Sequence, residues 1–555
     1  MTAWRLFSSG RLKELTRRTA RFLLALNKTK EEILYPEWRR NWVELNESER
    51  EKIVQMAIDL PHNPSFSLLL NNQEQASTSI LKTINSILNQ LYPNWILFID
   101  GYDLLDKKGQ QKIFEIQDTR IKIVDSYPSN SSELGEWVVE VAPGVQLDEK
   151  ALFANALAIV NNPEVKIVYG DHDHIDASNN FCDPHMKPDW NPDLFAAMNY
   201  LGPLIAVEKE LWIDNRTEKT DLNGLLSQTV ESVSGDEIFH ICDVLASVPV
   251  TDSRTHLSPN CKRTIHPLPE PNPSVSILIP TRDNGRMLDK CLKSIFEETS
   301  YSNFEVILVD HETSESKALK VIEEFKKKES FKTINFSGSF NFASMMNLAG
   351  AHAEGDVLIL LNNDVEAIDS GWLQELVSQV SRPEVGIVGA LLLFSDGTIQ
   401  HAGIHPGLGG LMGHGHKHLL GDSSGYFSRL KAVHSVAAVT GACMAVKKST
   451  WVDLGGMNED LAVAYNDVDL CLKARNSGLR VLFTPFARLL HHESVSRGID
   501  ESVEKNQRLQ DEIKIIQHEW GSFLDNDPAY NTNLSFDGGG FKLNKNPANN
   551  FKTIF

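Results

Sequence analysis

The stretch LILLNNDVE, residues 358 to 366, decides the fold class of this chain. Its continuous apolar run is typical of a strand buried on both faces, as in a parallel sheet. Asn362, Asn363 and Asp364 follow at the carboxyl edge, where open α/β sheets bind their ligands. A carboxylate there can hold a divalent cation together with substrate phosphates. Taken alone, the three polar residues are more typical of a turn, because Asn and Asp side chains bond to their own backbone.

Two apolar stretches upstream complete a βαβ pattern. SVSILIPTRDN, residues 274 to 284, predicts a buried strand that breaks at Pro280 and is followed by a helix. FEVILVDHETS, residues 304 to 314, predicts a second strand that ends at Asp310, and an acidic side chain there can accept hydrogen bonds from a ribose or a base. Neither strand is followed by GxGxxG or GxxxxGK[ST], so the dinucleotide fingerprint and the P-loop are both absent.

The stretch from residue 465 to 494, YNDVDLCLKARNSGLRVLFTPFARLLHHES, adds carboxylates and histidines. Asp467 and Asp469 open a predicted helix, a position where acidic side chains are often only caps. The strand that follows ends at His491 and His492, and imidazole is a common metal ligand.

Taken together, these motifs resemble family 2 glycosyltransferases with the A-type nucleotide-sugar fold, most of all tandem enzymes of bacterial polysaccharide assembly that are often labelled rhamnosyltransferases. The resemblance extends over residues 270 to 500 and is carried, in order, by PTRDN, VDHETS, NNDVE, VTGACMAV, LGGMNEDL, YNDVDLCLKARNSGLRV and HHESVSRG. It implies a hexosyltransferase-like enzyme that moves a sugar from a nucleotide-sugar donor to a glycan or lipid-linked acceptor in surface polysaccharide synthesis.

The resemblance also implies the residues that bind the donor. Those expected to border the nucleotide sugar are Pro280, Thr281, Asp310, Asn363 and Asp364. Asp364 would also bind the metal, Mn²⁺ or Mg²⁺. One position departs from the family pattern, because Asn362 stands where many relatives carry the first carboxylate of a DxD motif.

For the chemical step, the resemblance implies Asp467 as the catalytic base and His491 as a ligand of the metal and diphosphate, with His492 as a second candidate. Asn466 departs from the Glu that many relatives carry before the base. A cation that bridges the phosphates stabilises the leaving diphosphate, and a carboxylate takes the proton of the acceptor hydroxyl. A single base without an enzyme nucleophile implies inversion at the anomeric carbon, and Asp469 should face elsewhere on the same helix.

An internal repeat predicts that the chain holds two copies of this fold. NPEVKIVYG, residues 162 to 170, matches RPEVGIVGA at an offset of 220, and WILFID, residues 95 to 100, matches EVILVD at an offset of 210. The offset of 220 places Ala142, Pro143 and Gly144 opposite the metal motif, so the first copy is expected to be degenerate.

The expected organisation is therefore α/β, with two tandem A-type, Rossmann-like domains that have mostly parallel sheets. A stretch with four prolines between residues 261 and 274 predicts an extended interdomain linker. The limits we expect are a helical, basic N-terminal region over residues 1–60, the degenerate domain over 61–268, the catalytic domain over 269–504, and a C-terminal helix and tail over 505–555.

Two histidine-containing segments invite a metal hypothesis. In YGDHDHIDA, residues 169 to 177, alternation along a strand would let only Asp171 with Asp173, or His172 with His174, converge, and we expect a surface hairpin rather than a metal site. Residues 401 to 418 combine five His with six Gly, but their spacing matches no usual ligand pair. A lid or acceptor loop is the better expectation there.

Composition bounds the remaining possibilities. The 555 residues suit two or more globular domains, and a net charge of −20 argues against general binding of nucleic acid. Six cysteines without CxxC spacing predict free thiols in a reducing compartment, and neither a membrane-spanning run nor a signal peptide is expected, which together favour a cytoplasmic protein. Residues 1 to 30 hold eight basic residues and one acidic residue among apolar ones. Such a helix either lies on an anionic membrane surface, here the inner face, or packs on the protein.

Two alternatives belong to other functional classes. A non-catalytic glycan-assembly scaffold is favoured by the Asn substitutions and by the decay of the first copy. A nucleotidyltransferase would share a similar sheet, but it needs a Gly-rich, basic loop for a triphosphate, of which PTRDNGR is a poor version.

Overall fold

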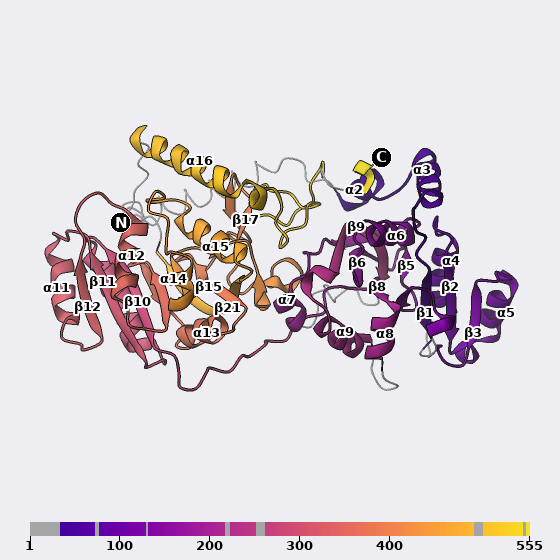
Figure 1. Ribbon diagram of the computed structural model, residues 1–555, viewed down its shortest axis with the longest axis horizontal. Coiled ribbons are helices and arrows are strands. Elements are labelled where there is room, and N and C mark those ends of the chain that lie inside the picture. The colour runs from indigo at the N-terminus through magenta and orange to yellow at the C-terminus, as the bar shows by residue number, and fades with distance from the viewer. Residues whose placement is uncertain are drawn as a thin grey trace, which may run out of the picture.

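The computed structural model describes residues 34–72, 77–128, 131–216, 222–250, 261–492, 503–547 and 551–554. In this part of the chain, two large mixed sheets lie one after the other along the long axis of the molecule, each with helices on both faces (Figure 1). We call the unit built on the sheet of β1 to β9 the first domain and the unit built on the sheet that starts at β10 the second domain. The limits expected at residues 61–268 and 269–504 remain a proposal.

The first domain places its strands in the order β3-β2-β1-β4-β8-β6-β9-β5, with β7 paired to β6. Its strands are β1 (Phe66–Asn71), β2 (Trp95–Asp100), β3 (Ile121–Val124), β4 (Trp137–Val141), β5 (Gln146–Leu147), β6 (Ile167–Ile175), β7 (Phe181–His185), β8 (Ile205–Glu208) and β9 (Ile238–Pro249). The helices are α2 (Tyr35–Trp42), α3 (Glu47–Ile58), α4 (Ser77–Leu88), α5 (Lys107–Ile116), α6 (Ala151–Asn161), α7 (Pro192–Ala197), α8 (Lys209–Asn215) and α9 (Leu222–Glu231).

The second domain orders its strands β12-β11-β10-β13-β20-β15-β21-β14, with β16 paired to β15 and β19 to β21. Its strands are β10 (Val275–Thr281), β11 (Phe304–Asp310), β12 (Phe331–Asn335), β13 (Val357–Leu361), β14 (Val365–Ala367), β15 (Val385–Leu393), β16 (Ile399–His401), β17 (Ile404–Pro406), β18 (Met412–His414), β19 (His434–Ser435), β20 (Cys443–Lys447) and β21 (Arg480–His491). The helices are α10 (Gly285–Lys293), α11 (Ser316–Phe325), α12 (Phe342–His352), α13 (Trp372–Val380), α14 (Lys448–Asp453), α15 (Asn466–Asn476) and α16 (Val503–Asp525).

The two sheets have the same order of eight strands along their main path, and the second sheet has β19 in addition. The parallel pair β1–β4 corresponds to β10–β13, and the antiparallel pair β4–β8 corresponds to β13–β20. The parallel pair β6–β9 and its antiparallel neighbour β5 correspond in the same way to β15–β21 and β14. The predicted fold class, two tandem α/β domains of one kind, is thereby confirmed.

Strand β13 shows why the apolar run after residue 356 forms a central strand. Val357, Ile359 and Leu361 pack into the core on one face of the sheet, whereas Leu358 and Leu360 pack into the core on the other face. Burying each of these side chains contributes about 1.5–3 kcal/mol. A strand with two buried faces cannot continue into solvent without losing that burial, so the first polar residues mark its end.

The C-terminal segment ties the two domains together. After α16, the chain returns along the first domain, where the Trp38 indole N–H donates to the backbone oxygen of Asn544 over 2.7 Å and the Asn531 amide donates to Asp171 over 2.9 Å. Figure 1 shows the last short helix, in yellow, beside α2, in indigo. A direct contact between the domains adds to this, because Arg382 of the second domain lies 2.6 Å from Asp193 of the first.

The histidine- and aspartate-containing strand of the first domain differs from the sequence expectation. Residues 171 to 174 do belong to a hairpin of β6 and β7 whose turn, residues 177 to 180, is exposed, but every residue of β6 itself is buried. Asp173 bonds to Tyr35 and Arg39 of α2, and Asp171 bonds to the C-terminal segment. The prediction was wrong because these covering segments are distant in sequence.

The basic segment of residues 1 to 30 lies outside the described residues. In the ranges that the structure describes, no helix combines the length and the apolar character needed to cross a membrane.

Candidate active site

The carboxyl ends of three neighbouring strands bring the predicted nucleotide-binding residues together. Thr281 ends β10 and pairs with Asp310 at the end of β11, and β13 lies on the other side of β10. The Asn363 side-chain amide donates to the Thr281 hydroxyl over 2.9 Å, and Asp310 accepts from the backbone N–H of Thr313 over 2.9 Å. Pro280, one residue before the end of β10, is half-buried.

The NND motif forms a turn and also positions its carboxylate. The Asn362 backbone N–H donates to Ala442 over 3.0 Å, and its carbonyl oxygen accepts from Val365 over 3.2 Å, which links β13 directly to β14. Asp364 therefore lies between these two strands, where it is 7% exposed. The same three residues therefore form a turn and hold the Asp364 carboxylate at the end of the sheet.

Asp364 and His491 form the centre of the candidate metal site. Strand β14 pairs with the end of β21 so that Val365 faces His491, and this register places His491 Nε2 3.2 Å from Asp364 Oδ1. The other ring nitrogen, Nδ1, is 2.8 Å from Oε1 of Gln400, on β16. Because that oxygen can only accept, it fixes the proton on Nδ1, and the Nε2 lone pair faces the carboxylate. The Nε2 atom and the carboxylate oxygen can therefore serve as two ligand atoms for one cation.

His492 belongs to a different pair. Its Nε2 lies 2.8 Å from Glu366 and its Nδ1 lies 2.9 Å from the Ser395 hydroxyl. Glu366 in turn lies 3.3 Å from the ammonium group of Lys290. Of the two adjacent histidines, the structure therefore brings the side chain of His491, and not that of His492, to the Asp364 carboxylate. Alternation along a strand is the reason, since adjacent side chains point to opposite faces.

Asp467 lies in the first turn of α15. Its Oδ2 accepts the backbone N–H of Gly441 over 2.9 Å, so the VTGACMAV motif holds the carboxylate from outside its own helix. Its Oδ1 accepts the N–H of Val468 over 2.9 Å. Burial raises the pKa of Asp467 above the usual range, and these N–H donors oppose that rise. A carboxylate with a raised pKa binds a proton more readily than an exposed one.

Asp469 has structural partners instead. Its carboxylate accepts from the indole N–H of Trp520 over 2.9 Å and pairs with Lys473 over 2.8 Å. It is fully buried. The prediction that this residue faces away from Asp467 is confirmed by these contacts.

The His- and Gly-rich segment packs against the site rather than forming an irregular loop. It contains β17 and β18, which pair with each other, and His401, His405 and His416 in it are buried. His401 Nδ1 lies 2.8 Å from His414 Nδ1, and the other nitrogen of the His401 ring is 3.5 Å from the backbone nitrogen of Thr440, in the motif that holds Asp467. Sequence reasoning missed Gln400 because a single polar residue in a short strand carries no motif.

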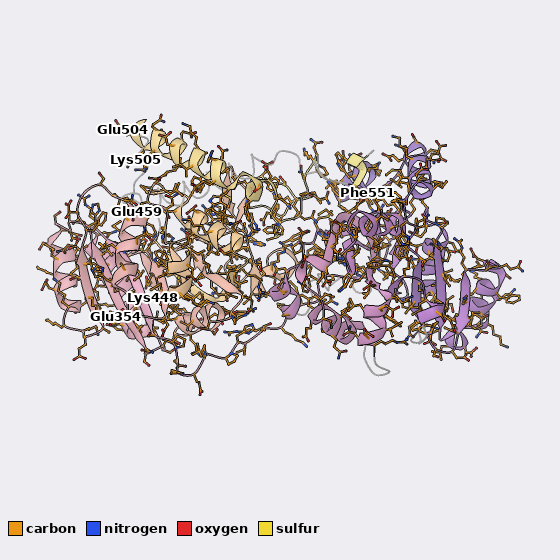
Figure 2. All side chains as sticks on the ribbon, in the orientation of Figure 1. Glu354, Lys448, Glu459, Glu504, Lys505 and Phe551 are labelled. Carbon is orange, nitrogen blue, oxygen red and sulfur yellow. The ribbon has the colours of Figure 1, made fainter. Side chains whose placement is uncertain are left out.

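A cavity elsewhere in the second domain does not include the candidate active-site residues. It measures about 700 Å³ and is lined by residues around Gly355, Asp356 and Lys448. These residues lie at the amino end of β13, the opposite edge from Asp364. Figure 2 labels Glu354 and Lys448 at this edge, at the other end of the domain from Glu504 in α16.

The first domain has no carboxylate or imidazole at the positions that correspond to Asp364 and His491. The Val145 N–H donates to Ala142 as the Val365 N–H donates to Asn362, so Gly144 takes the place of Asp364. Ser247 pairs with β6 as Leu490 pairs with β15, so the next residue, Val248, takes the place of His491. The first turn of α9 holds no acidic residue, whereas that of α15 holds Asp467 and Asp469. The sequence offset of 220 therefore agrees with the strand pairing.

Residues 276–423 match the family model described as Glycosyl transferase family 2. The matched residues lie in the second domain and include Asp310 and Asp364, whereas Asp467 and His491 lie beyond them. The chain is 32% identical over 556 residues to Uncharacterized protein y4gI of Sinorhizobium fredii (strain NBRC 101917 / NGR234). That alignment covers 91% of this chain and 61% of the relative. The chain is 28% identical over 554 residues to O-antigen biosynthesis protein RfbC of Myxococcus xanthus. That alignment covers 91% of this chain and 43% of the relative.

The third relative matches a shorter part of the chain. It is N-acetylglucosaminyl-diphospho-decaprenol L-rhamnosyltransferase of Mycobacterium tuberculosis (strain CDC 1551 / Oshkosh), 27% identical over 169 residues, which are 28% of this chain and 55% of that protein. The chain thus spans about half the length of the curated relatives it matches.

Proposed function

We propose that the second domain transfers a sugar from a nucleotide-sugar donor to an acceptor, with metal assistance and inversion at the anomeric carbon. The observation that carries this proposal is the arrangement of three groups at one edge of a family 2 sheet. Asp364 and His491 face each other at 3.2 Å, and Asp467 is held by Gly441 at the start of α15. The family match supports the reaction class.

The donor set at Asp364 and His491 fits Mn²⁺ or Mg²⁺. A carboxylate oxygen and an imidazole nitrogen suit Mn²⁺ best, because Mg²⁺ prefers oxygen ligands alone. A cation there would neutralise charge on the leaving diphosphate. Gln400 orients the His491 ring so that Nε2 is available, and Asn363 and Thr281, joined by their hydrogen bond, would shape the nucleotide side of the site.

Asp467 is the proposed base. Its carboxylate is fixed by the N–H groups of Gly441 and Val468, so it need not reorganise before it takes the proton of the acceptor hydroxyl. Asp469, the nearest other carboxylate on α15, is held by Trp520 and Lys473 and cannot act as a nucleophile. A single available carboxylate supports direct displacement, which inverts the anomeric configuration.

The proposed acceptor is a glycan or a lipid-linked glycan of bacterial surface polysaccharide. Two relatives support this choice: the name of one refers to O-antigen biosynthesis and that of the other to a glycosyl diphospholipid. A peripheral membrane contact through residues 1 to 30 belongs to the same proposal. The first domain, which lacks counterparts of Asp364 and His491, would scaffold the second domain or hold the acceptor.

The test is a transfer assay with Mn²⁺ or Mg²⁺ and a panel of nucleotide sugars, chosen by thermal shift because a ligand that binds the native state raises the melting temperature. The proposal expects metal-dependent transfer or slow hydrolysis of one donor, and an inverted linkage in the product by NMR. Asp467→Asn should abolish most of this activity, whereas Asp460→Asn, at an exposed carboxylate, should not. A fully stabilised protein that shows neither activity with any donor would instead support a glycan-assembly scaffold.

A further inference from the structure

A second group of metal-ligand side chains lies in the first domain, away from the glycosyltransferase site. One oxygen of Asp189, one ring nitrogen of His240 and the sulfur of Cys242 all lie within 4.8 Å of one another. His240 Nδ1 is 3.0 Å from Asp189 Oδ1 and 3.6 Å from Cys242 Sγ. No sequence motif announces this group, because Asp189 is more than fifty residues from the other two.

An irregularity in the sheet brings the two strand residues together. His240 lies on β9 where it pairs regularly with β6, and the register then shifts between Gly170 and Asp171, which leaves Cys242 and Asp243 without partners on β6. Such a bulge bends a strand and redirects its side chains, and bulges are common next to functional sites. The third residue is held from another direction, since the Asp189 backbone N–H donates to Pro528 of the C-terminal segment over 2.8 Å.

A carboxylate behind His240 orients its ring. Asp171 Oδ1 lies 2.9 Å from His240 Nε2, and Asp171 also accepts from the backbone N–H of Lys187 and from the amide of Asn531. Asp171 is 1% exposed and saturated with donors, which makes it an acceptor of the Nε2 proton. The Nδ1 lone pair then faces the carboxylate of Asp189 and the sulfur of Cys242, as in the carboxylate–histidine–metal arrangement of known metal sites.

The two separations from His240 Nδ1, to Asp189 and to Cys242, suit a tetrahedral ion. Bonds of about 2.0–2.1 Å to nitrogen or oxygen and about 2.3 Å to sulfur place tetrahedral ligands about 3.3–3.6 Å apart. The measured 3.0 and 3.6 Å are close to these values. Two of the three residues, Asp189 and His240, also line a cavity of about 510 Å³ between the domains, together with Trp190, Phe239, Arg480 and Pro528.

We propose that Asp189, His240 and Cys242 bind a zinc-class divalent cation, with a fourth coordination position open to the cavity between the domains. The sulfur ligand selects a soft or borderline ion over Mg²⁺ and Mn²⁺, so this site is distinct in chemistry from that of Asp364 and His491. The open position takes water or a small anionic ligand from the cavity. The competing explanation is an imidazolium of His240 held between two carboxylates, with no metal.

Cobalt substitution tests the proposal on the full-length protein. After chelation and dialysis, titration with Co²⁺ should give a thiolate-to-cobalt charge-transfer band that saturates near one equivalent and is displaced by Zn²⁺. The band should disappear in Cys242→Ser. It should persist in Cys182→Ser, a matched change at a half-buried thiol on β7, and in Asp364→Ala, which removes the proposed catalytic ligand. A band that survives Cys242→Ser, or no band in the wild type, would overturn the proposal.

A second variant, Asp189→Asn, tests the site without disturbing a buried residue, because a change at the buried His240 could impair folding by itself. The Asp189 side chain is 42% exposed, so the variant should fold as the wild type does. It should bind Zn²⁺ at least about tenfold more weakly, as expected when a metal site loses a supporting group. Unchanged Zn²⁺ affinity in calorimetry would assign the cluster to the imidazolium bridge instead.

Discussion

Asp467 is the proposed base, and its replacement separates catalysis from binding. Asp467→Asn keeps the size of the side chain and can still accept from Gly441, but it cannot take the acceptor proton. We expect kcat to fall by about 10²–10⁴ while the affinity for nucleotide diphosphate stays close to that of the wild type. Steady-state kinetics and calorimetry on the same preparation measure both quantities. Near-normal turnover would remove Asp467 as the base.

The raised pKa of Asp467 predicts a pH dependence. Burial favours the protonated carboxyl, and a protonated carboxyl cannot act as a base, so kcat should fall as the pH falls through the raised pKa. The acid limb should therefore lie above about pH 3.9, the ordinary value for Asp. The measurement is kcat against pH at saturating donor, metal and acceptor. If the residual activity of Asp467→Asn shows the same limb, another group is responsible for it.

The pair of Asp364 and His491 predicts a metal-dependent step in donor binding. Asp364→Ala removes the carboxylate of the NND motif, and His491→Ala removes the imidazole that lies 3.2 Å from it. In both variants, we expect Mn²⁺ to lose its effect on binding of nucleotide diphosphate. Glu329→Ala, at an exposed carboxylate of the same domain, is the control. Unchanged metal dependence in Asp364→Ala would place the ion elsewhere.

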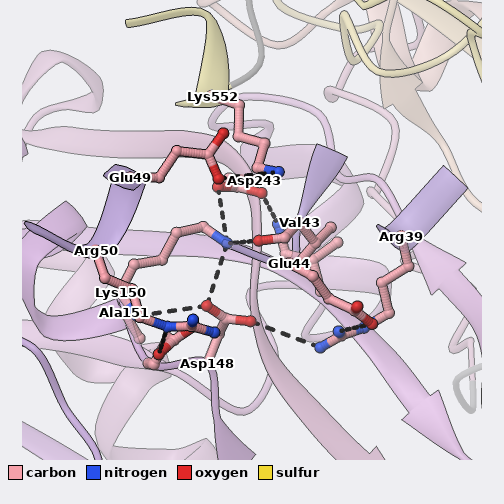
Figure 3. A network of polar contacts seen from close by, with 12 residues as sticks. Arg39, Val43, Glu44, Glu49, Arg50, Asp148, Lys150, Ala151, Asp243 and Lys552 are labelled. Atoms are coloured by element: carbon pink, nitrogen blue, oxygen red, sulfur yellow. Dashed lines mark hydrogen bonds and ion pairs between the residues drawn. The ribbon is translucent and has the colours of Figure 1, made fainter. Parts of the chain in front are cut away.

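At the scale of elements, the buried Lys150, directly before α6, forms an ion pair with Asp243 of β9 in the first domain. Figure 3 shows the Lys150 ammonium group within reach of Asp148, Asp243 and the Val43 backbone oxygen, at 3.2, 3.4 and 3.0 Å. Lys150 and Asp243 are both fully buried. Lys150→Met removes one partner of a buried charge pair, which costs about 3–5 kcal/mol.

The free energy of unfolding in urea measures that cost. The exposed Lys52→Met, on α3, should stay within about 0.5 kcal/mol of the wild type. If Lys150→Met unfolds at the same urea concentration as the wild type, the network contributes no net stability to the first domain.

The elements that could be predicted from sequence are those whose signal is local. Strand β13 was predictable because five consecutive apolar residues that end at polar Asn and Asp are typical of a strand with two buried faces. Helix α15 was predictable because its carboxylates and apolar residues have helical spacing. The role of residues 171 to 174 was not predictable in the same way. Their burial depends on α2 and on Asn531, more than a hundred residues away in either direction.

In the candidate site, too, some residues could be predicted from the sequence and others could not. Strand-end residues such as Thr281 and Asp310 meet because parallel strands share an edge, which follows from sequence order. Gln400 and the cluster of Asp189, His240 and Cys242 depend on a short antiparallel strand and on a bulge. Neither feature has a compositional signature, so these residues come together only in the folded protein.

At the scale of the whole molecule, the two domains share a strand order but differ in the side chains at the candidate metal position. Both sheets keep the same strand order, yet Gly144 and Val248 stand where the second domain has Asp364 and His491. A side chain added at Gly144 would meet Pro249 at 3.0 Å, and its backbone φ of +94° disfavours other residues, so the first domain has little room to regain a carboxylate there.

The number of metal-dependent nucleotide sites per chain tests this account most directly. We expect calorimetric titration of the full-length protein with Mn²⁺ and the nucleoside diphosphate that gives the largest thermal shift to show one such site, and Asp364→Ala to show none. Two sites, with one that survives Asp364→Ala, would mean that the first domain also binds donor and would contradict the assignment of transfer to the second domain alone.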